Sequence, residues 1–183
     1  MAPHLKTAFL SLGSNLGDRV AHIERAVSAL WQAGVVVFRR SSLYETEPVG
    51  TNTQRWFVNC VVEVETGLMP VALLHTLKRI ERGLGRNPST GAQPAARTID
   101  IDILAYGQLV ASSPELTLPH PRLAERRFVL EPLRELVPDW RHPITRLSVV
   151  EMLAALRNPS AIRRLREGTA SAVSRATPEP QGL

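Results

Sequence analysis

The sequence predicts an α+β domain in which the segments follow the order strand, helix, strand, strand, helix, strand. Two observations support this order. Runs of apolar and β-branched residues of strand length alternate with segments whose apolar residues recur every three or four positions. Each helical segment also begins or ends at a residue typical of helix caps and turns. The order is the split βαβ pattern of a ferredoxin-like fold, in which right-handed crossovers place both helices on one face of the sheet.

The N-terminal part of the chain supplies the first strand and the first helix. Residues 7–12 are expected to form a strand that runs into the turn Gly13-Ser14-Asn15. Asp18 is a candidate cap for the following helix, and Gly34 is expected to end it. The buried stripe of this helix is predicted to be Val20, Ile23, Val27 and Leu30.

The middle of the chain supplies two strands and the second helix. Residues 35–44 and 57–65 are predicted to be strands, with a loop at residues 45–54 between them. Pro70 suits the first turn of a helix. A long loop at residues 85–96 follows this helix, whose predicted buried stripe is Leu73, Leu77, Ile80 and Leu84.

Strict alternation marks residues 98–106 as a further strand. Three isoleucines at positions 99, 101 and 103 are expected to face one side, and Asp100, Asp102 and Leu104 the other. Residues 127–136 and 149–156 look helical. The domain is expected to span residues 1–157. Residues 158–183 are expected to be a disordered basic tail, with a short helix at residues 162–166.

The composition suits one globular domain and argues against several other classes of protein. The chain has 183 residues, 44% of them apolar, and a formal net charge of +5. Its longest apolar runs are far below the roughly 18 residues that a membrane span needs, and no secretory signal is apparent. Cys60 is the only cysteine, so an internal disulfide is excluded. We therefore expect a cytoplasmic protein with Cys60 in its core.

The strongest chemical signal is the pair Asp100 and Asp102 on the alternating strand. Two carboxylates at positions i and i+2 share one face of a strand, and their Cα atoms lie about 7 Å apart. Such a pair can hold hard cations together with substrate phosphates. An exposed polar face on an edge strand is the alternative reading.

Four further features are weaker. His120 lies between two prolines and close to several arginines, which suits either a polyphosphate cradle or a solvated surface loop. Phe57 and Asn59 share a strand face, and so offer a flat surface beside an amide, although Phe57 could equally be core. Phe128 is either a core residue or a stacking platform. The Gly13-Ser14-Asn15 turn suits an anion or a simple helix start.

Together these motifs resemble those of one family, the hydroxymethyldihydropterin pyrophosphokinases. The matching stretches occur in order between about residues 5 and 156. They are Gly13-Ser14-Asn15, Tyr44-x-Thr46-x-Pro48, Phe57-x-Asn59, Glu81 with Gly85-Arg86, residues 97–103, Pro119-His120-Pro121-Arg122 and Glu125-Arg126-x-Phe128.

The resemblance implies an antiparallel sheet between helical layers, an α-β-α sandwich on a ferredoxin-like core. It also implies a transferase of folate biosynthesis that moves diphosphate from ATP to 6-hydroxymethyl-7,8-dihydropterin and releases AMP. Two Mg²⁺ ions and ATP as co-substrate are implied, without nucleic acid or membrane. A monomer is expected, with dihydropteroate synthase as a pathway partner.

The resemblance also assigns roles to individual residues. Asp100 and Asp102 would bind the metal ions. Phe57 and Phe128 would sandwich the pterin ring, with Thr46, Val49 and Asn59 along its edge. The implied ATP contacts are Lys78, Glu81, Arg97, Ile103, His120 and Arg126. Arg86 would reach the phosphates from the loop at residues 85–96, and the implied catalytic set is Arg86, Arg97, Asp100 and Asp102.

The chain departs from the family pattern in a few places. Many members carry Arg-Trp-Gly-Pro before the arginine that matches Arg97, whereas this chain has Gly91-Ala92-Gln93-Pro94-Ala95-Ala96. A lid without that tryptophan would seal the site less well. Phe57 stands where a tyrosine is often found, and Lys78 where a glutamine is often seen.

Two other functions remain open from the sequence. A catalytically weakened relative could bind pterin or nucleotide as a regulator, since the lid aromatic is missing. An RNA-binding module could use the same order of elements. The second reading is disfavoured because Asp100 and Asp102 would repel phosphates unless metal ions intervened.

Overall fold

A computed structural model describes residues 5–48, 55–85, 97–157 and 160–165 of the chain. Its main sheet has six strands in the order β5-β1-β4-β3-β8, and β2 also pairs with β4. Neighbouring strands of this sheet are antiparallel. The strands are β1 (Lys6–Ser14), β2 (Val36–Arg40), β3 (Tyr44–Thr46), β4 (Phe57–Thr66), β5 (Asp100–Tyr106) and β8 (Ile162–Arg164).

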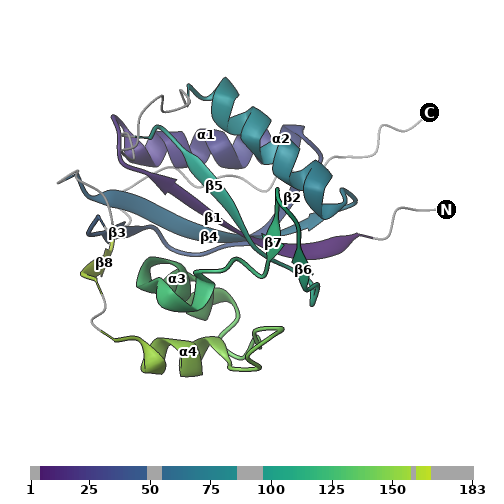
Figure 1. The fold of residues 1–183 in the computed structure, drawn as a ribbon. Helices are drawn as coiled ribbons and strands as arrows, with labels where there is room; N and C mark the ends of the chain where they lie inside the picture. The colour runs from purple at the N-terminus through teal and green to yellow at the C-terminus, as the bar shows by residue number, and fades with distance from the viewer. Residues whose placement is uncertain (1–4, 49–54, 86–96, 158–159, 166–183) are drawn as a thin grey trace, which may run out of the picture.

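Helices cover both faces of this sheet (Figure 1). On one face lie α1 (Arg19–Gln32) and α2 (Pro70–Gly83), whose side chains share a core with Leu10, Leu12 and Val62 of the sheet. On the other face lie α3 (Arg127–Leu136) and α4 (Val149–Ala155), which pack with Phe9 and Val61. A short hairpin of β6 (Ala111–Ser112) and β7 (Thr117–Leu118) and a 3-10 turn, η1 (Leu123–Glu125), connect β5 to α3.

The predicted alternation along β5 is confirmed by the two cores. Ile101 and Ile103 belong to the core beneath α1 and α2, whereas Leu104 belongs to the core beneath α3 and α4. Asp102 and Asp100 lie two and four positions before Leu104, so they share its face of the sheet. Both aspartates are only partly buried, because they lie nearer than Leu104 to the beginning of the strand.

Several local predictions are also confirmed. The side chain of Asp18 accepts a hydrogen bond from the Ala21 N–H at 3.0 Å and caps α1. Gly34 follows the end of α1 with φ of 76°, a conformation that favours glycine. Pro70 is the first residue of α2. Cys60 is fully buried in the core, and burial raises the pKa of its thiol to about 12.

The single strand predicted at residues 35–44 is two strands in the structure. Both β2 and β3 pair with β4, but Arg40 lies opposite Val62 and Tyr44 opposite Asn59. The chain therefore contains one extra residue between these pairs, as in a β-bulge. Ser41 spans the irregularity, because its hydroxyl accepts a hydrogen bond from the Val61 N–H at 3.0 Å.

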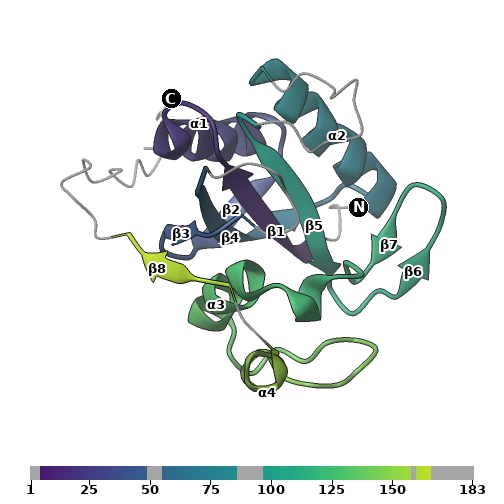
Figure 2. The same cartoon turned by 60° about the vertical axis from the view of Figure 1, so that its left-hand side comes forward.

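The helix predicted at residues 162–166 is wrong, because Ile162–Arg164 is the edge strand β8. It lies beside β3 (Figure 2), with Tyr44 opposite Arg164 and Thr46 opposite Ile162. The free edge of β3 offers backbone donors and acceptors that an isolated helical turn would leave unused. The main sheet therefore extends beyond residue 157.

Within these described ranges, no helix is long and apolar enough to cross a membrane.

Candidate functional site

The candidate site lies on the sheet face that carries α3, beside Gly13 of β1. Gly13 pairs with Asp100 of β5 on one side and with Asn59 of β4 on the other. Neighbouring strands are about 4.8 Å apart, so the acidic residue and the amide lie roughly 10 Å apart across the glycine. The next row of the same face contains Asp102, Ser11 and Val61.

Positive groups surround the two aspartates. Arg97 Nη1 donates to Asp100 Oδ2 at 2.6 Å. Asp102 Oδ2 lies 3.6 Å from Arg126 Nη1 and 3.9 Å from His120 Nε2. The structure therefore brings together five of the predicted residues, which come from three separate stretches of the sequence.

Electrostatics at Asp102 favour a ligand that brings positive charge. Partial burial and the neighbouring Asp100 carboxylate raise the pKa of Asp102, while His120, Arg126 and Arg97 act in the opposite direction. The Asp102 side chain is still 41% exposed, so a ligand can reach it.

The ring of His120 has a defined direction. The backbone N–H of His120 donates to the Leu104 carbonyl oxygen at 2.8 Å, which anchors this loop to β5. Nδ1 lies 3.1 Å from the Arg122 N–H and accepts its hydrogen bond. In the neutral ring the proton is therefore on Nε2, the nitrogen that faces Asp102. Burial lowers the pKa of His120 more than Asp102 raises it, so neutral His120 is favoured at pH 7.

The donor set suits magnesium in combination with phosphate oxygens. Among the described residues, no group of three or more His, Cys, Asp or Glu side chains could hold a metal ion by itself. Asp100 and Asp102 form a pair on one face, and Mg²⁺ usually takes one or two carboxylates plus water and substrate phosphates. The residues present therefore fit Mg²⁺ carried by a polyphosphate.

A second group of predicted residues lies on the other side of Gly13. Asn59 Nδ2 donates to Thr46 Oγ1 at 2.6 Å, and both residues are buried. This bond leaves the amide oxygen of Asn59 above Gly13, where an added Cβ would lie 2.5 Å from Oδ1 and 4.0 Å from Phe57 Cδ1. The Phe57 ring is partly buried.

Phe128 lies beside Arg126, on the acidic side of the site. It lies in the first turn of α3, which packs on β3 and β4. The Arg126 guanidinium carbon lies 5.4 Å from the centre of the Phe128 ring. Arg126 therefore contacts both Asp102 and the aromatic ring, and such a stacked arginine is held in a fixed orientation.

The residues expected on the nucleotide side lie along the outer edge of β5. Glu81 of α2 is buried, and its Oε1 accepts the Ile101 N–H at 2.7 Å. The Ile103 side chain faces the core beneath α1 and α2, so only its backbone can face a nucleotide. Lys78 is exposed on α2, one turn before Glu81. Val49, Arg86 and the departure at residues 91–96 lie outside the described residues.

Three features of the site escaped the sequence reasoning. Gly13 was assigned to a turn, but it lies within β1 and makes room for Asn59. The Asn15 side chain accepts the Arg97 N–H at 2.7 Å, and the Arg97 carbonyl oxygen accepts the Asn15 N–H at 3.2 Å. Glu45 of β3 is buried between Arg19 and Arg163. In the sequence, Glu45 is a charged residue at the start of a predicted loop, so no local signal indicated its burial.

Comparison with known proteins identifies the family. The family model for 7,8-dihydro-6-hydroxymethylpterin-pyrophosphokinase (HPPK) matches residues 9–138. The chain belongs to this family. The match covers both aspartates, the Gly13–Asn59 pair and Phe128, so the HPPK family is the one that the sequence motifs indicated.

Named relatives support the same assignment. A 2-amino-4-hydroxy-6-hydroxymethyldihydropteridine pyrophosphokinase of Bacillus subtilis is 45% identical over 130 residues, covering 70% of this chain and 77% of the relative. A protein of the same name from Methylorubrum extorquens is 43% identical over 159 residues. The match covers 86% of this chain and 98% of the relative. HPPK is thus an enzyme family of folate synthesis, and its members are pyrophosphokinases.

Other relatives are much longer than this chain. The folic acid synthesis protein fol1 of Pneumocystis carinii is 42% identical over 79% of this chain, which spans only 19% of that protein. A solved HPPK-DHPS structure of Plasmodium falciparum matches with a TM-score of 0.67 at 16% identity, over 83% of this chain and 45% of the other. At this identity the likeness concerns the fold, a mixed arrangement of helices and antiparallel sheet.

Proposed function

We propose that this chain transfers diphosphate from ATP to the hydroxymethyl group of 6-hydroxymethyl-7,8-dihydropterin. The hydroxymethyl oxygen attacks the β-phosphorus, the bond from that phosphorus to the α,β-bridging oxygen breaks, and AMP leaves. The hydroxyl proton is released, and the products are the pterin diphosphate and AMP.

The observation that carries this proposal is the row Asp100, Gly13 and Asn59 across three neighbouring strands. A carboxylate pair suited to a metal polyphosphate stands on one side of the glycine. A buried amide suited to a heterocycle stands on the other side. This spacing supports a reaction in which the hydroxyl and the phosphorus would meet between the two groups, and phosphoryl transfer depends mainly on such positioning.

On the phosphate side, Asp100 and Asp102 are proposed to bind two Mg²⁺ ions together with ATP. The ions would neutralise charge on the transferred phosphoryl oxygens. Arg97, Arg126 and the Nε2–H of His120 are proposed to donate to phosphate oxygens, a role that their short distances to the aspartates support. Further proposed ATP contacts are Lys78, Glu81 and the Ile103 backbone, with Arg86 reaching the phosphates.

On the pterin side, Asn59 is proposed to pair with the ring edge, together with the backbone near Thr46 and Val49. The hydrogen bond between Asn59 and Thr46 fixes the direction of the amide, which leaves its oxygen free to accept a ring N–H. Phe57 and Phe128 would stack on the two faces of the ring.

The finer fold class is also proposed here. Strands β5, β1, β4 and β2 lie in that order, and α1 and α2 share a core on one face. We infer a ferredoxin-like core, to which β3, β8, α3 and α4 are additions. We also propose that the chain acts as a cytoplasmic monomer. The HPPK-DHPS structure of Plasmodium falciparum supports a separate dihydropteroate synthase as a pathway partner.

The decisive experiment measures AMP by chromatography after incubation of the full chain with ATP, Mg²⁺ and 6-hydroxymethyl-7,8-dihydropterin. AMP and pterin diphosphate should form in equal amounts, and both should disappear when EDTA removes the metal. Tight pterin binding without AMP would instead support the weakened regulatory relative. Retention of RNA on a filter without AMP would support the nucleic-acid-binding alternative.

A further inference from the structure

The C-terminal segment at residues 160–165 completes the sheet beside the pterin side of the site. Its backbone bonds continue beyond the three paired residues of β8 in both directions. The Leu165 N–H donates to the Leu43 carbonyl oxygen at 2.8 Å, and the Glu47 N–H donates to the Ala161 carbonyl oxygen at 3.0 Å. The segment therefore follows the whole of β3, the strand that carries Thr46.

An ionic clamp joins β8 to the buried face of β3. Glu45 is 7% exposed. Its Oε1 accepts Arg19 Nη2 at 2.7 Å, and its Oε2 accepts Arg163 Nε at 2.6 Å and also pairs with Arg163 Nη2. Arg19 Nη1 donates to the Trp56 carbonyl oxygen at 2.8 Å, and the Arg163 guanidinium carbon lies 5.6 Å from the Trp56 ring centre. The clamp thus reaches the residue immediately before Phe57.

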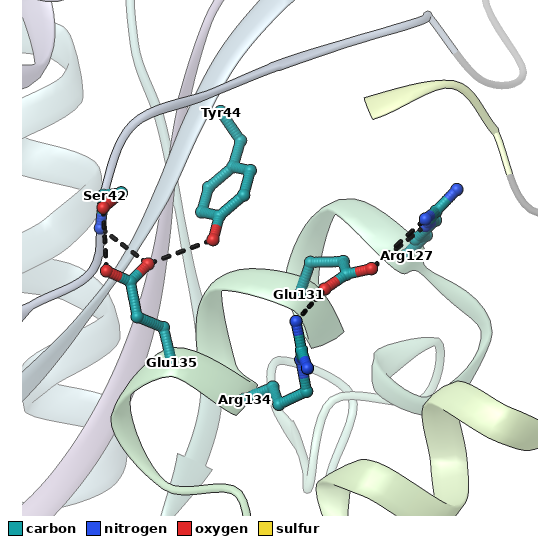
Figure 3. A network of polar contacts seen from close by, with 6 residues as sticks. All are labelled: Ser42, Tyr44, Arg127, Glu131, Arg134 and Glu135. Atoms are coloured by element: carbon teal, nitrogen blue, oxygen red, sulfur yellow. Dashed lines mark hydrogen bonds and ion pairs between the residues drawn. The ribbon is translucent and has the colours of Figure 1, made fainter. Parts of the chain in front are cut away.

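A second set of bonds fixes the other face of β3 to α3 (Figure 3). Glu135 accepts the Ser42 N–H at 3.0 Å, the Ser42 hydroxyl at 2.7 Å and the Tyr44 hydroxyl at 3.1 Å. Arg164 of β8 lies 3.5 Å from the same carboxylate. Because α3 carries Phe128, this set links the C-terminal strand to the second aromatic residue of the site.

Alternation explains how one short strand reaches both faces. Arg163 and Arg164 are neighbours in β8, so their side chains point to opposite sides of the sheet. Arg163 meets Glu45, and Arg164 meets Glu135. The Glu45 pair is the stronger of the two because its carboxylate is buried and accepts bonds from two arginines. The Arg164 contact is long and exposed, and so contributes little.

We propose that Glu45 and Arg163 are positioning residues for pterin, and that they hold β3 and the start of β4 so that Thr46, Asn59 and Phe57 keep their binding geometry. This inference rests on the proposed function. Within the described part of the chain, the hydrogen bonds and ion pairs of the clamp involve no phosphate-side residue, so its effect should be confined to one substrate. A displacement of about 1 Å in binding residues can cost a large factor in productive binding.

The test uses full-length Arg163→Ala and Glu45→Gln, with Arg134→Ala as the matched control. Arg134 is 55% exposed and pairs only with Glu131 of its own helix among the described residues (Figure 3). Calorimetry would measure the Kd of 6-hydroxymethyl-7,8-dihydropterin with Mg²⁺ and a non-hydrolysable ATP analogue. Separate titrations would measure the Kd of the analogue alone.

Both clamp variants should weaken pterin binding by about tenfold while the analogue stays within about twofold. Arg163→Lys should recover part of the affinity, since it keeps the charge and one hydrogen bond. The double variant, Glu45→Gln with Arg163→Ala, should bind pterin no more weakly than the single variants do. Unchanged pterin affinity, or an equal loss for both ligands, would overturn the proposal.

Hydrogen exchange supplies a readout that does not need the ligand. In Arg163→Ala, the amides of residues 44–47 should exchange faster, while those of α2 keep their protection. Unchanged protection of residues 44–47 would refute the clamp even if the enzyme assay succeeds. If wild-type protein bound no pterin, the proposed function and the role in pterin positioning would fail, and the exchange result would still decide whether Arg163 holds β3.

Discussion

Gly13 and Asn59 lie opposite each other on β1 and β4, and the amide of Asn59 occupies the space that a side chain at position 13 would need. A Cβ at Gly13 would lie 2.5 Å from Asn59 Oδ1, a distance that real Cβ contacts essentially never show. Gly13 is thus required for the close approach of a neighbouring side chain rather than for an unusual backbone angle.

Gly13→Ala should therefore displace the Asn59 amide and break its alignment with Thr46. We expect pterin affinity to fall about tenfold or more, with a loss of roughly 1–3 kcal/mol in unfolding free energy from overpacking. ATP-analogue affinity should change little. Calorimetry and urea unfolding measure these quantities.

Gly83→Ala is the matched control, because nothing lies within 4 Å of a Cβ added there. It should leave pterin affinity unchanged. Normal pterin binding by Gly13→Ala would show that the amide adapts and that Gly13 is dispensable.

Asp100→Ala and Asp102→Ala should abolish turnover without unfolding the protein. The Asp100 carboxylate disfavours the charged form of Asp102, and either variant removes this repulsion, so thermal stability should be kept. We expect the rate of AMP release to fall by more than about 100-fold, because charge on the transferred phosphates would lose its compensation.

Asp139→Ala removes an exposed aspartate just beyond the end of α3 and should retain full activity. Melting temperatures of all three variants would exclude unfolding as the cause. A near-normal rate in either site variant would contradict the metal assignment.

The strand at residues 98–106 could be predicted in detail because apolar and acidic residues alternate along it with a period of two. Only the isoleucine face of such a strand can be turned toward the core, so the acids must share the other face. The shared direction of Asp100 and Asp102 therefore follows from local sequence alone. The cap at Asp18 and the helix start at Pro70 were predictable for a similar reason, since each depends on neighbours within a few positions.

Features that depend on long-range pairing were not predictable. The role of Gly13 depends on the register of β1 against β4, and the bulge near Ser41 depends on β4 as well. Strand β8 pairs with residues more than 100 positions earlier. A three-residue segment carries too little periodicity to distinguish an edge strand from a helical turn.

Phe128→Ala should weaken pterin binding much more than ATP binding. The ring is partly buried at the start of α3 and carries the Arg126 guanidinium at 5.4 Å. Loss of a stacking face is worth about 0.5–1.5 kcal/mol beyond the area it buries. We therefore expect pterin affinity to fall by about tenfold or more in calorimetry, and ATP-analogue affinity by much less.

Phe128→Leu separates stacking from burial, because it keeps an apolar side chain without a flat face. It should bind pterin nearly as weakly as Phe128→Ala while keeping more of the thermal stability. Phe38→Ala removes a ring that is 65% exposed on β2 and serves as a control. Equal losses for pterin and nucleotide in Phe128→Ala would argue that the ring only supports α3.

Acid should weaken the link between β3 and β8 through Glu45. Burial raises the pKa of Glu45, but the hydrogen bonds from Arg19 and Arg163 outweigh it and hold the pKa below its usual value of 4.5. A carboxyl group of this kind stabilises the fold fully above its unfolded pKa and loses that contribution as the pH falls through the folded pKa. The free energy of unfolding of wild type should thus exceed that of Glu45→Gln by about 1–2 kcal/mol at pH 7. The gap should shrink below pH 4.5, as measured by urea unfolding across that range.

The control for this prediction is Glu115→Gln, which alters a carboxylate that is 56% exposed and lies 3.5 Å from His75. Its unfolding free energy should follow that of wild type at every pH. Salt should reduce the difference in unfolding free energy between wild type and Glu45→Gln at pH 7, because Arg163 is 71% exposed. The reduction should be only partial, because the Glu45 carboxylate itself is shielded from solvent. A gap between wild type and Glu45→Gln that stayed constant from pH 7 to pH 3 would mean that packing, rather than the charge of Glu45, holds β3 in place.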